Sequence, residues 1–216
     1  MENDYSDISF RLLDLSDADD FMEWYSDEKV SKFCSWDAFT SKQAAIQHVA
    51  DTVIPHPWHK AICLKSKPIG SISVTPFFGN DSCRAELGYV LGSKYWGKGI
   101  ATTAVKMVAS TIFVEWSHLE RLEAVVDVEN LGSQRVLEKA GFTREGILRK
   151  YYLLKGKPRD SVIFSLVSTD AHAHSSSPPV GATRPGHSSP TSTGAERVEN
   201  NPILYHPNII INIEEQ

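Results

Sequence analysis

A glycine-rich turn separates a strand-like segment from a helix-like segment near the middle of the chain. The turn is residues 96–102 (Trp-Gly-Lys-Gly-Ile-Ala-Thr), between the strand-like residues 85–91 and the helix-like residues 103–109. Glycine permits backbone conformations that other residues avoid, and a helix N-terminus presents N–H groups with a partial positive charge. The turn therefore predicts a place that holds a phosphate or pyrophosphate on backbone N–H groups.

The composition predicts a single soluble domain that binds neither nucleic acid nor a membrane. The chain has 216 residues, of which 41% are hydrophobic and 23% charged, which is enough for one substantial core. Its net charge of −5 disfavours polyanions and suits a cationic partner such as an amine. The acidic N-terminus resembles no targeting signal, and no apolar stretch approaches a membrane span in length. We expect a cytoplasmic protein, with the nucleus as a further compartment.

Hydrophobic periodicity predicts a mixed α/β (α+β) domain with a mostly antiparallel sheet flanked by helices. Ser16 and Ser41 are expected to cap the first two helices, and Gly141 suits the left-handed end of a later one. The expected strands are residues 8–12, 58–64, 69–74, 83–91, 122–126 and 161–167, and the expected helices are residues 16–25, 41–53, 103–113 and 133–139.

The character of the sequence changes at Ser168. The residues that follow are rich in Gly, Pro, Ser and Thr, so we expect a domain over residues 1–167 and a disordered tail over residues 168–216. The apolar end of the tail is expected either to dock on the domain or to bind something else. His172 and His174 lie in this polar tract, and three scattered cysteines show no metal-ligand spacing, so no metal site is expected.

The turn does not match the common nucleotide-binding patterns. It lacks the Gly-Lys-Ser/Thr ending of a triphosphate loop and the G-x-G-x-x-G of a dinucleotide fold. An ordinary strand–helix turn would be the favoured alternative if the glycines stood alone. However, the aromatic pair Tyr95-Trp96 precedes them, the small Ala101 follows them, and residues 130–142 (Asn-Leu-Gly-Ser-Gln-Arg-Val-Leu-Glu-Lys-Ala-Gly-Phe) come about thirty positions later.

This combination resembles the GNAT superfamily of acetyl-CoA-dependent N-acetyltransferases. It is most similar to the RimJ/RimL group, which acetylates protein N-termini. The residues that carry the resemblance are 86–89 (Glu-Leu-Gly-Tyr), 95–102 and 130–142, and the similarity covers about residues 8–167. The turn begins with Trp96 where the wider family has Gln or Arg, and this departure is usual in the RimJ/RimL group.

The resemblance implies a site for acetyl-CoA and no metal. The pantetheine arm would pair with the strand that ends at Leu91, and the pyrophosphate would sit on the turn. The strand at residues 122–126 would diverge and leave room for the thioester. The implied cofactor-binding residues are Tyr89, Val90, Leu91, Trp96, Gly97, Lys98, Gly99, Ile100, Ala101, Thr102 and Asn130.

Each residue at the start of the later helix has two interpretations. Asn130 caps the helix, contacts the CoA arm, or does both. Ser133 lies one turn further on the same helix face. By family resemblance it donates a hydrogen bond to the departing thiolate, and its alternative is a surface serine without a role.

Glu86 is the other candidate catalytic residue. A carboxylate within a central strand is uncommon without a partner. It would accept the substrate's proton, directly or through water, or bind the cationic amine. The alternative is an ion pair with Arg84 or Arg121. Tyr151 and Tyr152 would line the amine pocket or pack within a strand.

These features predict acetyl transfer to a primary amine by direct attack in a ternary complex. An α-amine has a pKa of about 7.7–8.0 and a lysine about 10.4, so deprotonating the α-amine costs roughly 3.4 kcal/mol less. This difference favours a protein N-terminal α-amine as the acceptor. The alternatives are a polyamine, amino acid or antibiotic-like amine, or a catalytically inactive CoA-binding sensor. No local motif supports a covalent cysteine route, and a monomer and a homodimer both fit.

Overall fold

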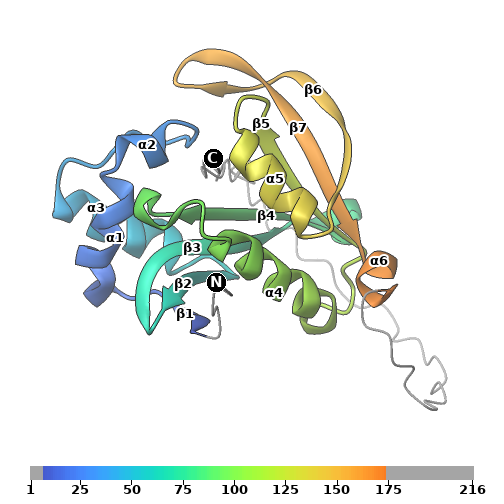
Figure 1. Ribbon diagram of the computed structural model, residues 1–216, viewed down its shortest axis with the longest axis horizontal. Helices are drawn as coiled ribbons and strands as arrows, with labels where there is room; N and C mark the ends of the chain where they lie inside the picture. Colours follow the sequence, from blue (N-terminus) through green and yellow to red (C-terminus); the bar gives the residue numbers. More distant parts are fainter. Residues whose placement is uncertain (1–6, 174–216) are drawn as a thin grey trace, which may run out of the picture.

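A computed structural model describes residues 7–173 and shows one seven-stranded sheet (Figure 1). The strand order is β1-β2-β3-β4-β5-β7-β6, and every neighbouring pair is antiparallel except β4 and β5. This arrangement confirms the expected mostly antiparallel sheet. The strands are β1 (Ile8–Leu12), β2 (His59–Leu64), β3 (Lys67–Pro76), β4 (Arg84–Leu91), β5 (Arg121–Asp127), β6 (Thr143–Leu154) and β7 (Lys157–Val167).

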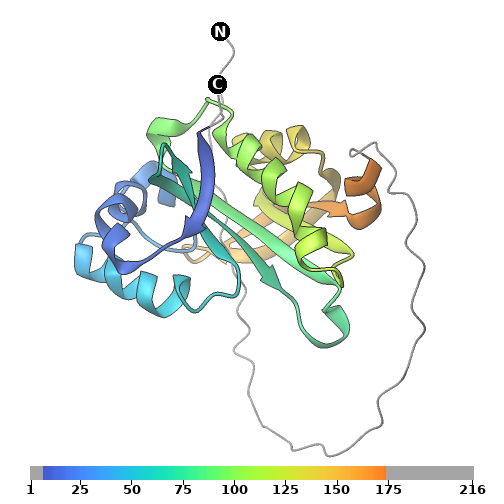
Figure 2. The same ribbon diagram turned by 90° about the horizontal axis from the view of Figure 1, so that it is seen from below.

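Helices cover both faces of the sheet (Figure 2). On one face lie α1 (Ala18–Tyr25), α2 (Glu28–Ser31) and α3 (Lys42–His48), which continues into a π-helical turn, η2 (Val49–Val53). On the other lie α4 (Ile100–Glu115) and α5 (Leu131–Lys139). Each face has its own hydrophobic core, because alternate strand residues point to opposite faces. Within the described residues, no helix is long and apolar enough to cross a membrane.

The helix caps and the segment after β7 agree only in part with what the sequence predicted. The first helical segment is capped by Asp14, which forms a capping box with Asp17, and not by Ser16. Ser41 caps α3 as expected, and Gly141 is left-handed with φ 94°. At the expected start of the tail, α6 (Ser168–Ala173) follows β7 directly, and Ser168 hydrogen-bonds to Glu120. The rest of that expected tail lies outside the described residues.

The parallel pair of strands separates after a short contact. β4 and β5 pair only at Arg84↔Arg121, Ala85↔Leu122 and Glu86↔Glu123. β4 continues to Leu91 along β3, and β5 continues along β7, so the two halves of the sheet diverge. The expected divergence is therefore confirmed, and within residues 7–173 no strand covers the β5-facing edge of the end of β4.

A buried carboxylate at the end of β5 holds that strand on the second half of the sheet. Asp127 is fully buried and accepts hydrogen bonds from Arg159 on β7 at 2.8 Å and from the Tyr152 hydroxyl on β6 at 2.9 Å. The backbone N–H of Glu129 adds a third donor at 2.8 Å. Burial by itself raises the pKa of Asp127, but these hydrogen bonds outweigh it and lower the pKa below its ordinary value.

We expect Asp127→Asn to destabilise the fold by about 2 kcal/mol at pH 7, because a fully buried carboxylate that accepts from Arg159 with both oxygens is replaced by an amide with one acceptor oxygen. Because the folded pKa of Asp127 is depressed, its contribution exists above the unfolded pKa of about 3.9 and is lost as the pH falls through the folded value. Urea unfolding at several pH values should show the difference from wild type shrinking in acid.

Asp37→Asn is the matched control. Asp37 also pairs with a cation, Lys155 at 3.2 Å, but its side chain is 88% exposed. An exposed pair contributes at most about 1 kcal/mol. Equal destabilisation by the two variants would contradict the anchoring role of Asp127.

Candidate functional site

The glycine-rich turn folds as its composition predicts. Gly97 and Gly99 have φ values of 69° and 74°, in the left-handed region that other residues enter at a cost of about 1–2 kcal/mol. Gly99 is the N-cap of α4, and no side chain caps that end of the helix. A side chain added at Gly97 would meet no atom within 4 Å, so the surface over the turn is open. The first N–H groups of α4 are thus arranged for an anion.

Trp96 fastens the turn to the end of β4. Its indole N–H donates to the carbonyl of Leu91 at 2.8 Å, and its ring packs against both hydrophobic cores. Ile100 and Ala101 are buried beneath the turn, whereas Lys98 is exposed. The Thr102 hydroxyl in the first turn of α4 is buried and has no hydrogen-bond partner among the described residues.

Asn130 caps α5 with its side-chain oxygen, and its side-chain nitrogen makes no hydrogen bond among the described residues. The residue is 1% exposed, and its Oδ1 accepts the backbone N–H of Ser133 at 3.2 Å. Its Nδ2 is buried and has no hydrogen-bond partner within the described part of the chain. A buried amide nitrogen without a partner costs about 1–3 kcal/mol. The capping interpretation is therefore confirmed, and the remaining donor points to a ligand contact as well.

Ser133 and Tyr89 join α5 to β4 across the divergence. Ser133 is fully buried, so the alternative of a surface serine is wrong. The Tyr89 hydroxyl donates to the Ser133 carbonyl at 3.3 Å. Tyr89 and Leu91 point to the α4–α5 face, whereas the Val90 side chain belongs to the core under α1 and α3.

Glu86 stands on the opposite face of β4, beside a second carboxylate. Its register partner on β5 is Glu123, which binds Arg84 at 3.2 Å and Arg121 at 2.8 Å. The alternative interpretation of Glu86, an ion pair with Arg84 or Arg121, is therefore wrong, because both arginines pair with Glu123 and not with Glu86. Among the described residues, none forms an ion pair with Glu86. Burial, followed by the nearby charge of Glu123, raises the pKa of Glu86 to about 8.

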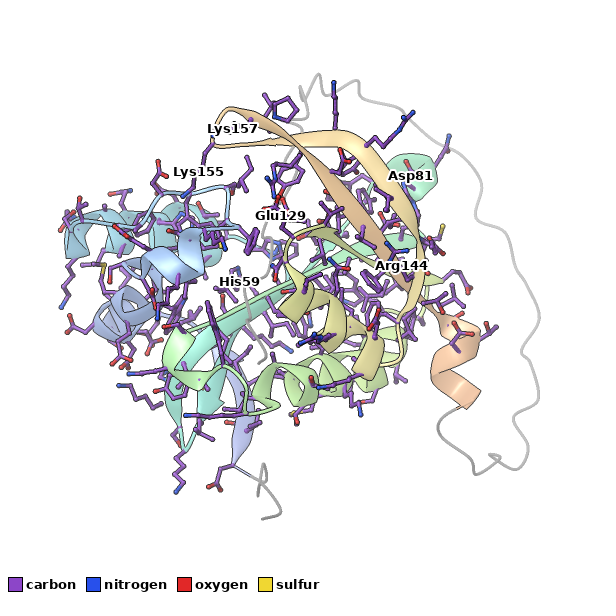
Figure 3. All side chains as sticks on the ribbon, turned by 45° about the horizontal axis from the view of Figure 1, so that its top comes forward. His59, Asp81, Glu129, Arg144, Lys155 and Lys157 are labelled. Atoms are coloured by element: carbon purple, nitrogen blue, oxygen red, sulfur yellow. The ribbon has the colours of Figure 1, made fainter. Side chains whose placement is uncertain are left out.

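The sequence alone did not predict a strip of polar side chains on the same face as Glu86. We call it the polar strip; it consists of Ser71, Ser73, Thr75, His56 and His59. Ser73 and Thr75 alternate along β3, and Thr75 is the register partner of Glu86. His59 on β2 is the partner of Ser73 and lies beside the central strands, as the sticks in Figure 3 show. The His59 Nε2 is buried and has no partner in the described chain, and His56 hydrogen-bonds to the Thr75 hydroxyl at 2.9 Å. The signal that could have found this strip is the row of hydroxyls at alternate positions of a buried strand: Ser71, Ser73 and Thr75.

The β6–β7 hairpin closes this face from the other half of the sheet. Tyr152 packs with Phe33 and Leu154 in a small buried cluster, and its hydroxyl is held by Asp127, so it is a packing residue. Tyr151 is 49% exposed, and the charges of Glu86 and Glu123 contribute, after burial, to raising its pKa. The interpretation of Tyr151 as a residue that lines the amine pocket stays a prediction.

The predicted residues form two groups on opposite faces of the divergence. The turn, Asn130, Ser133 and Tyr89 lie on the α4–α5 face, and Glu86 lies on the α1–α3 face with the polar strip. The described residues contain no group of three or more His, Cys, Asp or Glu side chains that could hold a metal ion. Chemically, the arrangement offers an anion cradle on one side and a raised-pKa carboxylate on the other.

Comparisons with known proteins agree on one family. A family model described as an acetyltransferase (GNAT) domain matches residues 7–143. The chain is 32% identical over 176 residues to the uncharacterized N-acetyltransferase p20 of Bacillus licheniformis, covering 79% of this chain and 98% of that protein. It is 33% identical over 88 residues to the ribosomal protein uS5-alanine N-acetyltransferase of Escherichia coli (strain K12), and the match covers 39% of this chain and 43% of that protein. It superposes with a TM-score of 0.66 on the microcin C7 self-immunity acetyltransferase in complex with acetyl-CoA and AMP. The sequence identity is 25%, and the match covers 74% of this chain and 92% of that protein.

Glu86→Gln is expected to stabilise the protein at high pH. The pKa of Glu86 is about 8 in the folded state, above the roughly 4.3 of an unfolded glutamate, so wild-type stability falls as the pH rises between these values. At pH 5 the protonated carboxyl resembles the amide, and the two proteins should unfold alike. At pH 9 the variant should resist urea better. The exposed Glu138 of α5 is the matched control: a similar gain in Glu138→Gln would contradict this assignment.

Proposed function

The chain belongs to the GNAT acetyltransferase family and is an acetyl-CoA-dependent N-acetyltransferase, and on this premise we propose that its acceptor is the α-amino group of a protein N-terminus. The single observation that carries the proposal is the carboxylate of Glu86. It is half-buried at the point where β4 and β5 begin to diverge, is without an ion-pair partner among the described residues, and has a pKa raised to about 8. A base with this pKa matches an α-amine, whose pKa is about 7.7–8.0.

The residues on the α4–α5 face suit the cofactor. We place the pyrophosphate on the N–H groups that follow Gly97 and Gly99, where the helix N-terminus favours negative charge. The pantetheine amides would pair with the uncovered edge of β4 as an added strand does. The partnerless Nδ2 of Asn130 would donate to this arm. Acetyl-CoA supplies the acetyl thioester at the point where β4 and β5 part.

Glu86 and Ser133 would have different roles, one on each face of the sheet. Glu86 would accept the proton that the acceptor amine loses as it attacks, directly or through one water. On the other face, Ser133 at the N-terminus of α5 would donate a hydrogen bond to the departing thiolate, and the partial positive charge of the helix end would favour that anion. Burial raises the pKa of the Cys34 and Cys63 thiols, which supports direct attack over a cysteine intermediate.

The charges at the acceptor face support a monoamine over a polyamine. A polyamine carries several cations, and each needs a carboxylate or another acceptor when it is buried. Two carboxylates face each other here, but the arginines Arg84 and Arg121 already bind Glu123. Glu86 is therefore the one carboxylate of the two that could pair with an ammonium group of the acceptor, which is enough for a monoamine. The name of the uS5-alanine relative points in the same direction.

A small-molecule amine is the second candidate acceptor. The observation that favours it is the similarity to an acetyltransferase that confers self-immunity to microcin C7 and was solved with acetyl-CoA and AMP. The buried polar strip around His59 offers hydrogen-bonding groups to a compact polar acceptor. The relatives reported above that carry an organism name come from bacteria, and no observation supports the nuclear compartment.

An acceptor screen tests the proposed function. Thiol release from acetyl-CoA should be fastest with peptides that have a free N-terminus, at least tenfold slower with the same peptides blocked at the N-terminus but carrying lysine, and slow with spermidine. Glu86→Gln should lower kcat by about 10²–10⁴-fold with acetyl-CoA affinity unchanged. A preference for small amines would move the second candidate to first place. Binding of acetyl-CoA with no thiol release on any amine would establish a sensor.

Asn130→Ser separates capping from cofactor binding. Serine caps helices about as well as asparagine, so stability should change by less than about 0.5 kcal/mol. The variant lacks the amide N–H, so the Kd for CoA measured by calorimetry should rise about tenfold. Asn80→Ser, in an exposed turn, is the control and should bind CoA as wild type does. If Asn130→Ser also binds normally, Asn130 only caps the helix.

A further inference from the structure

The ring orientation and tautomer of His56 follow from its hydrogen bonds. The backbone N–H of Trp58 donates to His56 Nδ1 at 3.1 Å, so Nδ1 accepts and the ring proton lies on Nε2. Burial lowers the pKa of His56, so the ring stays neutral near pH 7. Its Nε2–H therefore donates to the Thr75 hydroxyl oxygen at 2.9 Å.

This bond determines what the Thr75 hydroxyl can do. Because its oxygen accepts from His56, its own hydrogen must point elsewhere. His56 precedes β2, on one side of β3, and β4 lies on the other side. Thr75 and Glu86 are register partners on β3 and β4, so their side chains stand next to each other on one face, with Cβ atoms about 4.5–5.5 Å apart.

We propose that His56 and Thr75 are positioning residues for Glu86: the imidazole orients the Thr75 hydroxyl as a donor to the Glu86 carboxylate through one bridging water. The inference rests on the proposed role of Glu86 as the base and adds to it. The donated hydrogen bond stabilises the ionised carboxylate, which is the form that takes up a proton from the amine. The pair thus keeps enough of the base ionised near neutral pH to accept that proton.

The other charged groups around Glu86 do not supply this donor. From β5, Glu123 repels the carboxylate, and Arg84 and Arg121 are occupied by Glu123. From β6, the half-exposed Tyr151 has its pKa raised by burial first and by the charges of Glu86 and Glu123 after it, so its phenol stays neutral near pH 7. On the Thr75 side, burial lowers the pKa of His59 to about 3, with smaller effects of His56 and His48, so His59 carries no positive charge at neutral pH.

The test is the titration of Glu86 in Thr75→Val, which removes the hydroxyl at nearly constant shape. Carboxyl ¹³C shifts of the free protein, assigned with Glu86→Gln, report the pKa of Glu86 without any turnover. We expect the pKa to rise by about one unit in Thr75→Val, because a hydrogen bond to the ionised form is lost. The acidic limb of kcat/KM should move by the same amount, giving about tenfold lower kcat/KM at pH 6 and convergence with wild type at high pH.

Conservative variants separate orientation from packing. Thr75→Ser keeps the hydroxyl and should restore the wild-type titration. His56→Phe should raise the pKa of Glu86 as Thr75→Val does, and His56→Gln, which keeps a donor near the Nε2 position, should restore most of it. Thr111→Val on the exposed side of α4, and the exposed His118→Phe, are the matched controls and should leave Glu86 unchanged.

An unchanged Glu86 titration in Thr75→Val would overturn the inference, whatever happens to activity. Loss of activity at all pH values without a change in that pKa would also overturn it, because it would indicate altered packing only. Failure of the proposed function gives a different result. If Glu86→Gln remained active, Glu86 would not be the base, yet the ¹³C titration would still show whether Thr75 and His56 hold its carboxylate.

Discussion

The divergence of one parallel pair of strands is the constraint on which this structure depends. β4 and β5 share a short ladder that ends at Glu86 and Glu123, and each then follows a different antiparallel neighbour. The separation persists because each strand has a better partner on its far side. Asp127 ties the end of β5 to β6 and β7, and Trp96 ties the end of β4 to the glycine-rich turn. The division of the sheet into two halves opens the gap in which we propose that the thioester and the amine meet.

The two faces of the divergence have different chemistry because alternate residues of β4 point to opposite sides. Tyr89 reaches Ser133 at the start of α5, on the face with the glycine-rich turn. Glu86 projects to the face covered by α1 and α3 and has the hydroxyl of Thr75 beside it. Arg84 and Arg121 bind Glu123, so of these two neighbouring carboxylates it is Glu86 that has no ion-pair partner among the described residues. A carboxylate whose pKa is raised by burial lowers the stability of the fold at high pH, and such perturbed pKa values are often found at functional sites.

The sequence predicted the local elements better than the contacts between them. Gly97 and Gly99 were expected in a turn at a helix N-terminus, and both adopt the left-handed backbone that makes glycine necessary there. Ser41 and Gly141 were assigned correctly as cap residues for the same reason: capping depends on neighbours within four positions. Ser16 was assigned wrongly because Asp14, two positions earlier, forms a reciprocal capping box with Asp17 that outcompetes it.

The sequence by itself determined the glycine-rich turn at a helix N-terminus, the alternation that separates Glu86 from Tyr89, and the family resemblance that rests on residues 86–142. Only the tertiary structure decided which carboxylate the arginines bind, which donor remains on Asn130, and which hydroxyl stands beside Glu86. The physical reason is that these properties belong to pairs of groups far apart in the chain. Strand register brings Thr75 to Glu86 and Glu86 to Glu123, and a carboxylate's pKa depends on what surrounds it after folding.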